Sequence, residues 1–249
     1  MTPPQDLFGA IPVWVGVYVL AALALGITTI VLYQRVVRLV LLGRPGRTDR
    51  PITRLVGALM PVLGQAKVLQ NVSLNDRAGL AHLFIFWGFL SFSFSYLIFI
   101  FVDPAWHPFS AWLLTDTGVR VFSSYLDVLA LAFLLAVPIA MARRWVQTPR
   151  RLSFDLTQKP DAAVILVLVA LLMVLTLLTE AMYVAAGGDG PHADALVGGA
   201  IGQELTDAGI SEGIANGFHG FFWWLHLGVI LGFGMYIPFS KHMHMIGAP

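Results

Sequence analysis

Five separate stretches of this chain are each long and apolar enough to cross a lipid bilayer as a helix. They run over about residues 12–32, 79–102, 119–141, 162–186 and 214–239. The hydrocarbon core of a membrane takes about 20 apolar residues per helix, and backbone groups left unpaired in lipid are costly. The sequence therefore predicts an all-α membrane protein. We expect a bundle of five transmembrane helices that forms a single membrane domain over residues 1–249 and is surrounded by the lipid bilayer.

The low charge content excludes several classes of protein. Charged residues make up 12% of the chain and hydrophobic residues 57%, whereas soluble domains usually carry about 25% charged residues. This excludes a soluble enzyme and a disordered chain. The net charge of +1 gives no sign of a nucleic-acid partner. The absence of cysteine excludes an iron–sulfur cluster held by this chain alone.

The basic residues predict how the bundle is oriented. Of 15 lysines and arginines, only Arg120 falls on the side of the bundle that holds the N-terminus. Short cytoplasmic loops carry the excess of lysine and arginine. The N-terminus is therefore predicted to lie outside and the C-terminus in the cytoplasm, in the cytoplasmic membrane of a bacterium or an archaeon.

The segment between the first two spans, about residues 52–70, is apolar but is interrupted by Arg54 and Lys67. We interpret it as an amphipathic piece on the membrane surface, in which Pro61 breaks any straight helix. The alternative is an ordinary loop with helical turns.

Four histidines are the candidates for cofactor chemistry: His82 near the start of the second span, His226 within the fifth, and His242 and His244 just after it. An ionisable ring inside a span is costly unless it binds something or finds a partner. Imidazole is also a common axial ligand of haem iron. The alternative is that these rings only pack, or meet lipid headgroups.

Depth in the membrane suggests how the histidines pair. His82 is level with His242 and His244, so a haem b can be held between spans 2 and 5 near the cytoplasmic side. His226 and His244 lie 18 residues apart, five full turns, and share a helix face, but Pro238 between them leaves the choice of His242 or His244 open. His226 would bind a second, outer haem or act alone. One haem is expected and two are possible.

Two acids also fall within predicted spans. Asp127 and Glu180 both lie nearer the outer end. Either could pass a proton to or from a quinone, because quinone chemistry moves protons together with electrons. The alternative is that each carboxyl group is close enough to the interface to stay hydrated.

Three segments carry a resemblance to a known family: RAGLAH at Arg77–His82, WWLH at Trp223–His226 and IPFSKHMH at Ile237–His244. With the five-span pattern, the chain resembles the gamma-subunit-like cytochrome b domain of respiratory nitrate reductase. The branch it resembles is joined to heterodisulfide-reductase-like iron–sulfur proteins, including electron-transfer-flavoprotein:quinone oxidoreductases.

The resemblance implies a subunit that carries electrons through haem b between a cytoplasmic iron–sulfur protein and membrane menaquinone or ubiquinone. The iron–sulfur domain would be another chain, or another part of a longer polypeptide, and electron-transfer flavoprotein is a further possible partner. The family's second span supplies two histidines, but here it offers only His82. His226 and His244 match the pair on the fifth span. The chain would serve an oxidoreductase complex and would not be a complete enzyme.

Two other classes of function compete with this interpretation. Intramembrane His, Asp and Glu could serve a proton- or ion-coupled transporter or channel, although neither inverted repeats nor broken helices are evident. A passive anchor would need none of these side chains for chemistry.

Overall fold

Long helices dominate the computed structural model, which describes residues 3–4, 11–43, 49–70, 72, 78–106, 109–147, 159–240 and 243. The main helices are α1 (Val13–Leu32), α5 (Ala78–Ser95), α6 (Phe109–Ala142), α8 (Lys159–Ala185) and α10 (Glu212–Tyr236). With their extensions, these are the five helices long and apolar enough to cross a membrane, as the sequence predicted.

Short extensions and smaller helices complete the chain. α1 continues through the wide turn Tyr33–Val37 and α2 (Arg38–Leu41). α5 continues through Tyr96–Val102, α6 through Arg143–Gln147 and α10 through Ile237–Phe239. The smaller helices are α3 (Pro51–Leu63), α4 (Ala66–Leu69) and α9 (Gly198–Asp207).

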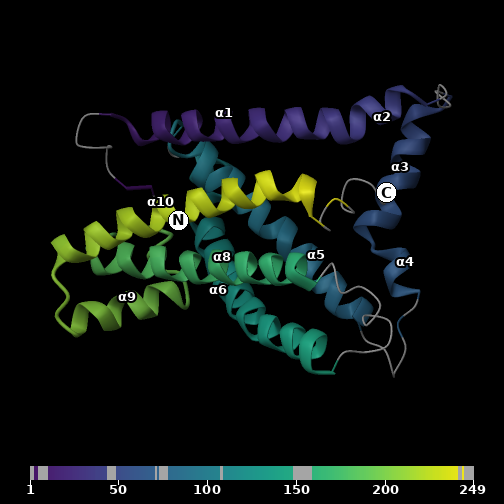
Figure 1. Cartoon of the computed structure of the whole chain (residues 1–249). Helices are drawn as coiled ribbons and strands as arrows, with labels where there is room; N and C mark the ends of the chain where they lie inside the picture. The colour runs from purple at the N-terminus through teal and green to yellow at the C-terminus, as the bar shows by residue number, and fades with distance from the viewer. Residues whose placement is uncertain are drawn as a thin grey trace.

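The helices form a bundle around α8 and α10, which lie side by side and run in opposite directions (Figure 1). α1 lies along α10, α9 packs against α8, and α5 and α6 cross the others obliquely (Figure 1). Small residues allow the closest contact: a Cβ on Gly202 of α9 would lie 2.6 Å from the carbonyl oxygen of Ala181 on α8. Such small residues are typical of helix packing inside membranes, because backbones can approach without a side chain between them.

The bundle has two chemically different ends. We call "basic end" the one at which α1 and α10 finish and α5 and α8 begin, and "acidic end" the opposite one. Among the described residues, Arg35, Arg38, Arg143 and Arg144 lie at the basic end. Arg120, at the acidic end, is paired with Asp194, with 2.9 Å between its Nε and Oδ2.

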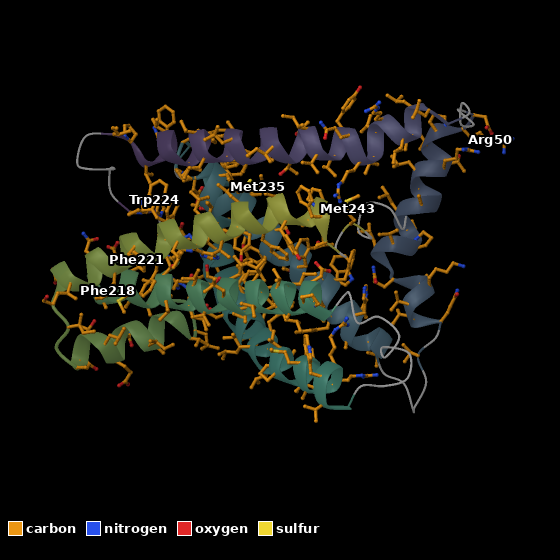
Figure 2. All side chains as sticks on the ribbon, viewed as in Figure 1. Arg50, Phe218, Phe221, Trp224, Met235 and Met243 are labelled. Atoms are coloured by element: carbon orange, nitrogen blue, oxygen red, sulfur yellow. The ribbon has the colours of Figure 1, made fainter. Side chains whose placement is uncertain are left out.

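Apolar side chains cover both the inside and the outside of the bundle. Phe218 and Phe221 of α10 are exposed (Figure 2). Trp223 and Leu227 of the same helix are buried in the core. A helix that is apolar on all sides suits lipid as its surroundings.

The predicted surface segment is helical, with one correction. α3 leaves all its side chains exposed except that of Val62, which is half-buried. It continues through Pro61, contrary to the expected break. Proline removes the hydrogen bond to the carbonyl group four residues earlier, that of Gly57. Because Gly57 is itself exposed, its carbonyl group can find other partners at little cost.

The third spanning helix begins ten residues before its predicted start. α6 starts at Phe109, but Thr115 has a φ of 63° and divides the helix into two parts. The Thr115 hydroxyl group accepts a hydrogen bond from the Gly118 N–H (3.3 Å), as an N-cap of the longer second part.

Candidate functional site

A cavity of ≈ 320 Å³ lies among α5, α6, α8 and α10. This volume is at the lower end of the range for small-molecule sites, roughly 300–1,000 Å³. The cavity walls are almost entirely apolar and include the rings of Phe86, Phe89, Phe92, Phe133 and Phe233. Three side chains with polar atoms line it, all on the α5 side: His82, Ser93 and Tyr96.

His82 marks the end of the cavity near the basic end of the bundle. It lies in the first turns of α5, lines the cavity and is exposed there. From His82 to Tyr96 the helix rises by about 21 Å, at 1.5 Å per residue. The cavity is therefore long, and it follows α5 from the basic end towards the middle of the bundle.

Gly234 of α10 leaves open space in the opposite wall. It lines the cavity, and a Cβ built on it would meet no other atom within 4 Å. Haem is a flat, apolar macrocycle with a metal at its centre. The cavity offers such a group a histidine, a row of aromatic rings and, at Gly234, a wall without a side chain. The described residues therefore fit one haem at the His82 end.

The basic end of α10 is anchored just before the SKHMH segment. Arg35 donates a hydrogen bond to the carbonyl oxygen of Pro238 (3.2 Å) and lies 4.7 Å from the centre of the Phe239 ring. The Tyr236 hydroxyl group donates to Asp161 of α8 (2.5 Å). His242 and His244, predicted as partners of His82, lie outside the described residues. The structure thus fixes the helix end from which they extend.

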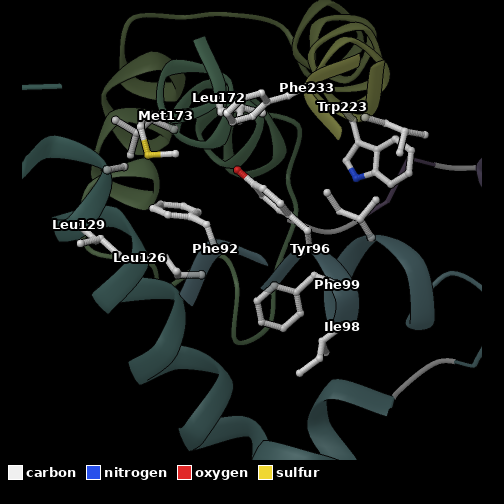
Figure 3. Close-up of a cluster of buried hydrophobic side chains, with 14 of the residues drawn as sticks. Phe92, Tyr96, Ile98, Phe99, Leu126, Leu129, Leu172, Met173, Trp223 and Phe233 are labelled. Atoms are coloured by element: carbon white, nitrogen blue, oxygen red, sulfur yellow. The ribbon is translucent and has the colours of Figure 1, made fainter. Parts of the chain in front are cut away.

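His226 lies in the core, near the other end of the cavity. Its ring is 1% exposed, and its Nε2 is 3.4 Å from the Tyr96 hydroxyl oxygen. The two rings are almost perpendicular, with centres 5.3 Å apart. Figure 3 shows the Tyr96 hydroxyl group pointing towards Leu172 and Phe233, both of which line the cavity.

The Tyr96–His226 pair could not be predicted from the histidines alone. Tyr96 opens the wide turn Tyr96–Val102, in which the Asp103 N–H bonds the carbonyl oxygen of Ile98, five residues earlier (2.9 Å). Such π-helical turns are frequent at functional sites. A tyrosine one helix away from a buried histidine gives no periodic signal in a sequence, so only the packing brings the two together.

The two predicted acids lie together, and both are buried. Asp127 of α6 is 0% exposed and Glu180 of α8 is 4% exposed, with the two carboxyl groups within interaction range. The packing of α6 against α8 thus places the two carboxyl groups beside each other inside the bundle.

Asp127 has a structural task as well. Its Oδ2 accepts hydrogen bonds from the N–H groups of Val197 (2.7 Å) and Gly198 (2.8 Å) at the start of α9. Glu180 packs beside the same turn, because a Cβ on Gly198 would lie 2.7 Å from the Glu180 Cβ. The connection over residues 187–213 contains α9, and these contacts hold it as a cover over the Asp127–Glu180 pair.

The remaining described histidines bond within the bundle. His219 Nδ1 is 3.1 Å from the carbonyl oxygen of Thr179, and His192 Nδ1 is 3.1 Å from the hydroxyl oxygen of Ser123. Within the described part of the chain, no three His, Asp or Glu side chains gather as a metal-ion site. Haem needs fewer protein ligands than such a cluster, since one or two axial groups suffice.

Comparisons with known proteins give two relatives. The chain is 27% identical over 209 residues to the probable iron–sulfur-binding oxidoreductase FadF of Bacillus subtilis (strain 168), covering 84% of this chain and 28% of that protein. It is 24% identical over 220 residues to the EtfAB:quinone oxidoreductase of Syntrophomonas wolfei, covering 83% of this chain and 28% of that protein.

No family model matches the chain, and no solved structure matches it. The chain spans about 28% of the length of the curated relatives it matches. Most of this five-helix chain is thus similar to a minor part of two larger proteins named as oxidoreductases.

Proposed function

We propose that this chain is a membrane cytochrome b subunit or domain that relays electrons between an iron–sulfur partner and the quinone pool. The observation that carries the proposal is the long aromatic cavity with His82 at the basic end. The two relatives, named as an iron–sulfur-binding and a quinone oxidoreductase, support electron transfer over a transporter or a passive anchor.

His82 and a histidine after α10, His242 or His244, would hold one haem b. When bound, haem b supplies a one-electron carrier. The aromatic walls offer apolar contact to a flat ring, and Gly234 leaves space for it. The contacts of Arg35 and Tyr236 hold the end of α10, after which these two histidines follow in the sequence.

The basic end would face the cytoplasm, because lysine and arginine are retained there. An iron–sulfur protein or domain, alone or with electron-transfer flavoprotein, would then meet the bundle on the side of His82. The carboxyl pair Asp127–Glu180 would lie towards the outer face and is our candidate for holding a proton during quinone chemistry.

The test is the absorbance of the purified protein in detergent. A reduced-minus-oxidised difference spectrum with b-type bands, and one haem per polypeptide by quantification, are the expected results. A protein that is folded, was produced with haem available and still has no such bands would exclude the relay.

Filling the cavity should displace the haem without removing a ligand. We expect Gly234→Leu to lower the haem affinity roughly tenfold, because overpacking typically costs about 1–3 kcal/mol. Gly232→Leu is the matched control, since Gly232 lies on the same helix, also has open space at its Cβ and does not line the cavity. Haem content is measured for both after titration with hemin. Equal affinities in the two variants would separate the haem from this cavity.

A further inference from the structure

A second haem held by His226 would need a free nitrogen on the His226 ring, but the Tyr96 hydroxyl group lies against that nitrogen. The Tyr96 hydroxyl group is 3.4 Å from His226 Nε2, and Phe92 packs against the Tyr96 ring with 6.0 Å between ring centres. Among the described histidines, His192 and His219 bond elsewhere, and His82 lies about 21 Å from the level of Tyr96 along α5. The described residues do not fit an outer haem held by His226.

The same pair does fit a different group. Tyr96 lines the cavity, and its hydroxyl group is held by a partner on another helix, His226 of α10. Both residues are buried. A fixed hydroxyl group at one end of an aromatic, apolar cavity can bond a carbonyl oxygen, and the walls can enclose a flat ring. A ring with carbonyl groups that is soluble in lipid is a quinone.

We propose that the end of the cavity at Tyr96 binds the headgroup of a quinone, with the Tyr96 hydroxyl group bonded to one carbonyl oxygen and His226 behind it. This deepens the proposed function, on which it rests, by naming the site of its substrate. Ser93, one helical turn before Tyr96 and also lining the cavity, is a second polar contact for the ring.

Reduction of a quinone takes two electrons, which would come from the reduced iron–sulfur partner, and two protons, which would come from water, so its two carbonyl oxygens become hydroxyl groups. Tyr96 would give one proton to the oxygen that it bonds, and the imidazole of His226 would return a proton to Tyr96 from Nε2 while its Nδ1 takes one up, so that both rings end neutral. The second proton would reach the other carbonyl oxygen along the cavity from its His82 end, where that side chain is exposed. Oxidation of a quinol uses the same path in reverse.

The test uses photolabelling with an azidoquinone on the full chain in detergent, with menadione as competitor. We expect peptides containing Tyr96 to be labelled and menadione to prevent it. Tyr96→Phe, which keeps the ring and loses one hydrogen bond, should weaken menadione competition about tenfold. Tyr125→Phe is the matched control, because Tyr125 bonds Ser91 (3.1 Å), is exposed and does not line the cavity.

Haem quantification separates the two proposals. We expect His226→Gln to keep the wild-type haem content and to weaken menadione competition. Four results would each overturn the quinone site. Two concern the variants: a fall in haem per polypeptide in His226→Gln, or equal menadione competition in Tyr96→Phe and Tyr125→Phe. The other two concern the label: its attachment away from the cavity, or its loss when haem is loaded. A wild-type protein without haem but labelled at Tyr96 would refute the relay and leave the quinone site standing.

Discussion

We expect the His82→Ala variant to lose the b-type bands of the difference spectrum, with haem affinity reduced by about tenfold or more. His82 is the only described histidine that lines the cavity, so the other described histidines offer no replacement ligand there. Alanine preserves the helix, because it has the highest helix propensity. The measurement is haem per polypeptide in the detergent-purified variant, together with its helical circular dichroism.

Controls distinguish a lost ligand from a lost fold. His192→Asn also removes a histidine, but from the acidic end, and should keep the full spectrum. His82→Gly should regain haem when imidazole is added, because His82 is exposed and a small molecule can reach its place. Of His242→Ala and His244→Ala, only one should share the loss. An unchanged spectrum in His82→Ala would refute the ligand assignment.

The second large effect is on stability, at Asp127. Val197, the N-cap residue of α9, makes no side-chain cap, and Asp127 of α6 supplies one instead. Asp127→Ala leaves two N–H donors without this acceptor, and we expect it to lower the free energy of unfolding by about 2–4 kcal/mol. The measurement is a denaturant titration in detergent, together with the rate of protease cleavage between residues 187 and 211.

Two variants make this test specific. Asp127→Asn keeps an acceptor oxygen and should lose about half as much free energy. Asp207→Asn changes an exposed acid at the other end of α9 and should change neither the stability nor the cleavage rate. If Asp127→Ala were cleaved as slowly as the wild type, the cover formed by α9 would not depend on this carboxyl group.

Most of the helices could be predicted from the sequence, because each span is a local run of apolar residues that lipid forces to bond internally. Helix ends were harder to predict where polar residues belong to the helix. α6 begins at Phe109 because Thr115 caps a second part inside it, and α9 forms in a connection rich in glycine that gave no readable signal.

The residues of the candidate site also differ in whether the sequence could predict them. His82 and His226 could be singled out from the sequence, because a histidine inside an apolar run is rare and costly. Tyr96 could not, since a tyrosine in a span attracts no notice until its hydroxyl group meets a partner. Asp127 and Glu180 were named separately, 53 residues apart in the sequence, and only the packing of α6 against α8 brings them together.

The sequence by itself determined that the chain has five apolar helices long enough to cross a membrane, because that property depends on composition and on local order along the chain. Only the tertiary structure decided that a cavity runs from His82 to Tyr96, that His226 bonds a phenol, and that Asp127 caps α9. Each of these depends on contacts between helices that are far apart in sequence, which no local pattern along the chain can fix.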